Sequence, residues 1–218
     1  DMTMRTTSTR NPFLVEQNPI LKAFTDYEKY YFIGGSASWG NIRGVLKNNV
    51  PDLQLYEEDT LGGPRTDVWG LSDYDLFKAT VRIIKERNSK KPFFAYVQSA
   101  SFHRPFTIPK DRGSFETKKL TPEQLKNSGF MNEAEYNSFR FSDYSLGHFF
   151  ELVAKDPAFA NTIFVIHGDH GLPHYDASNL PEGFKSFGLN RYNVPLLVLA
   201  PGILPPERRE AMASEVDV

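Results

Sequence analysis

The sequence contains no cysteine among its 218 residues. Disulfide bonds and thiolate metal sites are therefore excluded, and any metal ion must be held by histidine, carboxylate, hydroxyl or carbonyl groups. No run approaches the roughly 18 apolar residues of a membrane span, and no secretory signal opens the chain. The chain also has no large excess of charge of one sign, since it contains 25 basic and 27 acidic residues. The net charge of −2 gives no reason to expect nucleic-acid binding through bulk electrostatics.

Apolar residues, by contrast, are plentiful: 40% of the chain is hydrophobic and 14% is aromatic. This is enough to bury a sizeable core, so residues 1–218 are expected to form a single domain, or most of one. A polar, loop-like sequence opens the chain, and an apolar–polar pattern resumes at its end. We accordingly expect the chain to be a fragment of a longer protein.

Four apolar runs predict buried strands. They are continuous rather than alternating, which is typical of a parallel sheet covered on both faces. The predicted strands are Lys29 to Ile33, Pro92 to Gln98, Thr162 to His167 and Val194 to Ala200.

Helical segments lie between these runs. Ser72, with Asp75 three residues later, has the spacing of a capping box, and Asn132 is a suitable N-cap. Strands that alternate with helices indicate an α/β sandwich with a mostly parallel sheet. The predicted helices cover residues 72–87 and 132–155, with weaker ones over 19–25, 40–48 and 121–127, and long loops are predicted over 51–68, 104–120 and 172–191.

Asp169 and His170 follow directly after the third predicted strand, in the run His-Gly-Asp-His-Gly over residues 167–171. A carboxylate beside an imidazole suits Zn²⁺ or Mn²⁺, and a strand end holds both side chains rigidly. A lone Asp-His pair is more often part of a solvated turn, but this context favours a metal site that needs further ligands. His167 and His174 flank the pair. Each is a candidate ligand, proton donor or orienting partner, and His167 is equally a candidate core histidine.

Two further clusters follow predicted strands. His103, in Ser-Phe-His-Arg-Pro-Phe after the second strand, is suited to bind an ester oxygen or to protonate a leaving group. A glycine-rich turn after the first strand runs into Trp39-Gly-Asn-Ile-Arg43. Its backbone N–H groups and Arg43 favour an anion such as phosphate or sulfate, and Trp39 is placed to wall a pocket. The alternative is a tight turn with a core tryptophan and a surface arginine.

Taken together, these blocks resemble the catalytic domain of the lipoteichoic-acid-synthase branch of the sulfatase superfamily. The matching pieces occur in the family's order over residues 29 to 202. They are Phe-Ile-Gly-Gly…Trp-Gly-Asn-Ile-Arg-Gly, Trp-Gly-Leu-Ser-Asp-Tyr-Asp-Leu-Phe, His-Arg-Pro-Phe, Gly-Asp-His-Gly and Val-Pro-Leu-Leu-Val-Leu-Ala-Pro-Gly. The resemblance implies an alkaline-phosphatase-like fold and a metal-dependent phosphoryl or sulfuryl ester enzyme, most closely a phosphoglycerol transferase or a phosphodiester or sulfate-ester hydrolase.

The resemblance also implies roles for individual residues. Asp169 and His170 match the family's late pair of ligands to a divalent ion, Mn²⁺ first and otherwise Zn²⁺, Mg²⁺ or Ca²⁺. His103 and Arg43 match groups that contact the anionic ester. The predicted substrate-binding set is completed by Trp39, Asn41 and His174.

The early acidic ligand and the hydroxyl nucleophile normally precede the first matching block, and are expected upstream of this chain. The hydroxyls of Thr6, Thr7, Ser8 and Thr9 lie nearest to that position. The parent protein is expected to be membrane-anchored and to act outside the cytoplasm on a lipid- or glycan-linked phosphate or sulfate ester. Two alternatives stay open: a formylglycine-dependent sulfatase, and a non-catalytic module that binds an anionic glycan or lipid head group.

Overall fold

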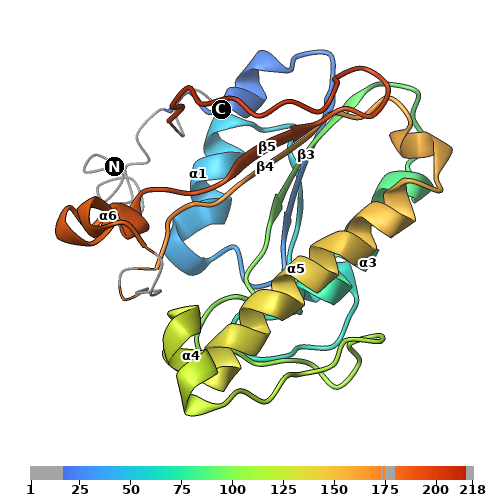
Figure 1. The fold of residues 1–218 in the computed structure, drawn as a ribbon. Coiled ribbons are helices and arrows are strands. Elements are labelled where there is room, and N and C mark those ends of the chain that lie inside the picture. The colour runs from blue at the N-terminus through green and yellow to red at the C-terminus, as the bar shows by residue number, and fades with distance from the viewer. Residues whose placement is uncertain (1–16, 173, 175–179, 215–218) are drawn as a thin grey trace. The chain divides into compact units, whose positions relative to one another are not determined.

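The computed structural model describes residues 17–172, 174 and 180–214 (Figure 1). Its contacts divide the chain into two compact units. The first comprises Asp1–Thr117 and Asn137–Lys155, and the second comprises Lys118–Tyr136 and Asp156–Val218. Thr6 to Thr9 lie outside the described residues, and the expectation of a single domain stays a prediction. Within the described ranges, every helix is too short or too polar to cross a lipid bilayer.

The first unit is built on a parallel three-stranded sheet in the order β2-β1-β3. Its strands are β1 (Glu28–Ile33), β2 (Gln54–Tyr56) and β3 (Phe93–Gln98). Side chains alternate across β1, so that Tyr31 and Ile33 pack into one cluster while Phe32 stacks on Tyr56. The strands predicted over 29–33 and 92–98 are confirmed, and their parallel pairing confirms the α/β class.

Helices cover both faces of this sheet (Figure 1). On one face lie η2 (Ile20–Ala23) and α1 (Ile42–Asn49), which is preceded by η3 (Trp39–Asn41). On the other face lies α3 (Asp73–Glu86). The predicted cap of α3 is confirmed, because Ser72 Oγ accepts from the backbone N–H of Asp75 at 3.2 Å. The helix α2 (Glu58–Leu61) and strand β2 both fall within residues 51–68, which the sequence predicts as a loop.

Helix α5 (Glu133–Val153) confirms the predicted helix over 132–155. Asn132 caps it, since its Oδ1 accepts from the N–H of Glu135 at 2.9 Å. In the first unit Phe141 is fully buried against Phe115 and Tyr144. Asp143 on the same helix is exposed.

The second unit contains an antiparallel strand pair, β4 (Phe164–His167) and β5 (Leu196–Leu199), with His167 opposite Leu196. Both strands confirm predicted apolar runs, but their antiparallel pairing differs from the parallel arrangement that these runs suggest. The predicted burial is also corrected, because the side chains of β5 are 38% to 49% exposed. The physical reason is that two strands alone cannot cover their own faces.

Short helices complete the second unit, and α6 and η5 fall within residues 172–191, which the sequence predicts as a loop. They are α4 (Pro122–Ser128), η4 (Pro157–Phe159), α6 (Glu182–Ser186) and η5 (Leu189–Arg191). Helix α4 begins with a capping box formed by Thr121 and Gln124, and confirms the weak helix predicted over 121–127.

Candidate functional site

The turn after β1 is shaped by two glycines. A Cβ on Gly34 would lie 2.8 Å from the carbonyl oxygen of Leu71, and one on Gly35 would lie 2.7 Å from that of Trp69. Real Cβ atoms do not approach backbone oxygen so closely, so only glycine lets residues 69–71 pack here. The backbone N–H of Leu71 donates a hydrogen bond to Gly34 O at 2.9 Å, which holds the two segments together. The two glycines are therefore required for the packing of these backbone segments, whether or not the turn also binds a ligand.

The anion that this turn holds in the structure is the protein's own carboxylate, Glu57. The N–H of Ala37 donates to its Oε2 at 2.8 Å, and Arg43 donates from Nε at 3.1 Å and from Nη2 at 2.5 and 2.7 Å. Burial opposes ionisation of Glu57, but these hydrogen bonds outweigh it, and the pKa of the carboxyl is lowered. An external anion would have to compete with Glu57 for Arg43. The ester-binding role of Arg43 stays a prediction, and its contacts favour a role in holding the turn.

Trp39 and Asn41 stand at the rim of the same turn. The side chain of Trp39 is 62% exposed, and Asn41 has a φ of 61° in the left-handed region that asparagine tolerates better than most residues. Gly40 before it has a φ of 56°. The succession of two left-handed residues turns the chain sharply into α1 while leaving the indole of Trp39 at the surface.

His103 joins Trp39 through a residue that the sequence analysis did not single out as functional, Trp69. The rings of Trp69 and His103 have centroids 4.0 Å apart, and those of Trp39 and Trp69 lie 5.9 Å apart, edge to face. We call Trp39, Trp69 and His103 the aromatic row. The indole N–H of Trp69 also donates to Arg104 O at 2.6 Å. The sequence signal available for it was the Trp-Gly pair at positions 69 and 70, directly before the capping residue Ser72.

The ring of His103 has a defined orientation. Its Nδ1 lies 3.0 Å from the carbonyl oxygen of Arg104. Because a carbonyl only accepts, Nδ1 carries the hydrogen in this arrangement, and Nε2 of the neutral ring keeps a lone pair. His103 can therefore accept a hydrogen bond through Nε2, or donate one when it is protonated.

Asp73 anchors the start of the loop that carries His103. It is fully buried, and its carboxylate accepts from the N–H groups of Ala100 and Ser101 at 2.7 and 3.0 Å and from Ser142 Oγ at 3.1 Å. Its own N–H donates to Ser101 Oγ at 2.7 Å. Burial raises the pKa of Asp73, and these hydrogen bonds partly offset that rise.

Asp169 and His170 lie at the end of β4 in the second unit, and both are exposed, at 87% and 68%. The carboxylate accepts from the N–H of His170 at 2.9 Å, and its Oδ2 lies 3.7 Å from His170 Nε2. The turn is held by the N–H of Gly171, which donates to Arg191 O at 2.9 Å. A Cβ on Gly171 would lie 1.9 Å from Asn190 O, so glycine is required there. His167 ends the strand with Nδ1 3.2 Å from Gly168 O.

One carboxylate and one imidazole, both accessible and adjacent, fit a divalent cation such as Mn²⁺ or Zn²⁺. They supply only part of a coordination shell. Among the residues that the structure describes, no group of three or more histidines or carboxylates is placed to hold a metal ion. The need for further ligands from elsewhere stays a prediction.

His174 is bound to a buried carboxylate. Its Nε2 lies 2.8 Å from Oε1 of Glu135, a residue with no exposed surface. The partner lies 39 positions away in the chain, so the sequence analysis did not find it.

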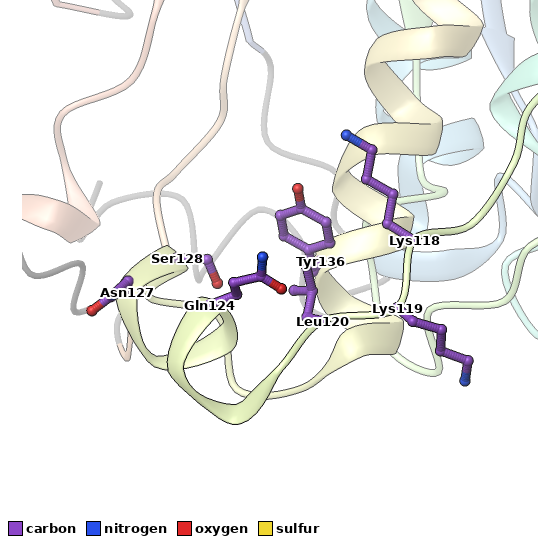
Figure 2. A pocket seen from close by; sticks show the side chains of 7 residues that line it. All are labelled: Lys118, Lys119, Leu120, Gln124, Asn127, Ser128 and Tyr136. Atoms are coloured by element: carbon purple, nitrogen blue, oxygen red, sulfur yellow. The ribbon is translucent and has the colours of Figure 1, made fainter.

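A hollow of about 560 Å³ in the second unit contains none of the predicted site residues (Figure 2). The ammonium of Lys119 at its edge lies 3.3 Å from Glu133, and the amide of Gln124 belongs to the capping box of α4. It is lined by Lys118, Lys119, Leu120, Gln124, Asn127, Ser128 and Tyr136.

Comparison with known proteins decides the family, since the model described as "Sulfatase" matches residues 7–218. The chain belongs to the sulfatase family. A lipoteichoic acid synthase-like protein of Bacillus subtilis, YvgJ, is 24% identical over 159 residues, which are 69% of this chain and 24% of that protein. The chain therefore spans about a quarter of the length of this curated relative.

Solved structures show the same fold. An alkaline phosphatase superfamily protein from Vibrio parahaemolyticus has a TM-score of 0.60 at 24% identity, over 85% of this chain and 41% of that one. The lipoteichoic acid synthase LtaP from Listeria monocytogenes has a TM-score of 0.67 at 22% identity, over 94% of this chain and 50% of that one. The phosphoglycerol transferase GacH from Streptococcus pyogenes was solved with sn-glycerol-1-phosphate. It has a TM-score of 0.54 at 20% identity, over 86% of this chain and 47% of that one. The resemblance and the alkaline-phosphatase-like fold are thereby confirmed.

Proposed function

We propose that the protein carrying this chain is a metal-dependent enzyme of phosphate or sulfate esters, of the phosphoglycerol-transferase kind. The observation that carries the proposal is the Asp169-His170 pair, which a strand end and a glycine turn hold at the surface of a sulfatase-family chain. Similarity to lipoteichoic acid synthases and to a phosphoglycerol transferase supports the choice of a glycerol phosphate ester. By the same similarity, we infer that the protein is membrane-anchored and acts outside the cytoplasm.

In this proposal Asp169 and His170 hold a divalent cation, with Mn²⁺ as the first choice. When bound, such an ion stabilises negative charge on an ester oxygen and lowers the pKa of a hydroxyl nucleophile. His103 contacts the ester through Nε2, which its bond to Arg104 O leaves available. The exposed indole of Trp39 packs against the glycerol or sugar part, as aromatic rings do with apolar ring and chain faces. Asn41, whose amide lies over Gly44, completes this part of the proposed substrate-binding set.

The test is the substitution Asp169→Ala. In the protein that carries this chain, we expect Mn²⁺ affinity and hydrolysis of a chromogenic phosphodiester to fall by more than about 100-fold, since a metal ligand should matter more than an orienting partner. Metal content after dialysis and initial rates measure both. Glu151→Ala, which removes an acid that is 70% exposed, is the matched control.

The proposed enzymatic function would be excluded if the wild-type protein retained no divalent ion and Asp169→Ala left its properties unchanged. The non-catalytic module that binds an anionic glycan or lipid head group would then be favoured.

A further inference from the structure

Glu135 is a carboxylate buried without any exposed surface in the first turn of α5. One oxygen faces His174 Nε2 at 2.8 Å, and the other accepts from the N–H of Met131 at 2.7 Å. Both oxygens therefore have partners. Together with the N-terminal end of a 21-residue helix, they offset the cost of burying the charge.

Stability alone does not explain this arrangement. Replacing a buried ion pair with apolar side chains of similar volume is often neutral or stabilising. Apolar residues at both positions 135 and 174 would thus serve packing at least as well as the pair does. What the carboxylate adds is a fixed direction for one particular imidazole.

The direction has a chemical consequence. A carboxylate accepts hydrogen bonds, so Nε2 of His174 carries the hydrogen, and Nδ1 of the neutral ring is left with its lone pair. The side chain of His174 is 29% exposed, so it is reachable at the surface while Nε2 faces the buried acid. A carboxylate that fixes the tautomer and orientation of a histidine is a recurrent arrangement at metal and catalytic sites.

We propose that Glu135 is a positioning residue that acts through His174. It holds the ring so that Nδ1 can accept a hydrogen bond from a hydroxyl of the ester or of its acceptor. His174 follows the pair Asp169-His170 in the chain, four residues after His170. The role of His174 rests on the proposed function; its pairing with Glu135 does not.

The pairing is tested by nitrogen and proton NMR of the 218-residue chain without metal, with the signals of His174 assigned by their loss in His174→Gln. We expect a slowly exchanging Nε2–H proton on His174 in the wild type and its loss in Glu135→Leu. Glu133→Gln, which changes the neighbouring acid that binds Lys119 and Leu120, should leave it in place. Hydrogen on Nδ1, or no protected Nε2–H in the wild type, would overturn the proposal. Should Glu135→Leu not fold, Glu135→Gln replaces it, with a shifted Nε2–H signal as the expected result and an unchanged one against the proposal.

The role is tested by a double-mutant cycle on phosphodiester hydrolysis by the protein that carries this chain. We expect Glu135→Gln and His174→Gln each to lower kcat about tenfold with little change in KM, and the double variant to lower it no further. Multiplying effects, about 100-fold together, would show that Glu135 acts through the fold rather than through His174. A protected Nε2–H signal in a protein that lacks all activity would contradict the proposed function and leave the pairing intact.

Discussion

The turns after β1 and β4 look alike in sequence, since each is a glycine-containing turn that follows an apolar strand. In the structure they differ in what their polar side chains already bind. After β1, Arg43 is engaged by Glu57 through three hydrogen bonds and by Ser38 through a fourth. After β4, Asp169 and His170 contact each other and adjacent backbone, and both are largely exposed.

The difference is in how accessible the charged groups of each turn are to an external ligand. A charged group whose partner is supplied by the fold is satisfied before any ligand arrives, and a ligand must compete for it. An exposed carboxylate beside an exposed imidazole remains free to bind a cation. The same reasoning gives Asp73 a structural role, because its carboxylate is saturated by the backbone that leads to His103.

The largest effect is expected from Asp73→Ala, which breaks the most deeply buried of these anchors. It removes the acceptor for two backbone N–H groups and for Ser142 Oγ, each of which costs about 1–3 kcal/mol when left buried and unpaired. We expect the free energy of unfolding to fall by about 3 kcal/mol or more, as measured by urea denaturation.

Asp143→Ala is the matched control on α5, since Asp143 is exposed. It should change stability by less than about 0.5 kcal/mol. Equal effects of the two substitutions would show that the Asp73 contacts do not hold the chain together.

A smaller effect is expected from Arg43→Ala. The guanidinium is 47% exposed and thus partly screened, so we expect a loss of about 1–2 kcal/mol at neutral pH, with Arg43→Lys in between. The pKa of Glu57 lies below its ordinary value of 4.5, so the folded state binds fewer protons than the unfolded one as pH falls through this range. The pair therefore stabilises the fold above about pH 4.5, and its contribution is lost as pH falls through the lowered pKa.

Denaturation curves at several pH values measure this, and the difference between wild type and Arg43→Ala should shrink in acid. One outcome would contradict the distinction between the two turns. If Arg43→Ala abolished glycerol phosphate binding and left stability unchanged, Arg43 would be the ester-binding group that the family resemblance implies.

Local features of the structure were predictable from sequence, and long-range partners were not. The strands β1 and β3 are continuous apolar runs, and Ser72 carries its capping signal within three residues. β2 was missed because it is only three residues long.

The partners of the site residues lie far away in the chain. Glu57 pairs with Arg43 across 14 residues, and Glu135 with His174 across 39, so no local pattern indicates either contact. Burial of β5 was wrongly inferred from composition, because hydrophobic content alone does not tell how many layers cover a strand.

The smallest effect on stability is expected from Trp39→Ala, which tests whether the rim of the first turn contacts a ligand. Trp39 is 62% exposed and touches Trp69 only edge to face, so its removal should change stability by less than about 1 kcal/mol. If it packs against the ester, affinity for glycerol phosphate should fall about five- to tenfold, the value of one aromatic contact. Trp39→Phe should retain most of that affinity.

Trp69→Ala should cost more stability, because the indole N–H bond to Arg104 and the contact with His103 are lost together. Titration calorimetry alongside urea denaturation separates the two effects. A Trp39→Ala variant that binds glycerol phosphate as tightly as the wild type would remove Trp39 from the site and leave its exposure unexplained.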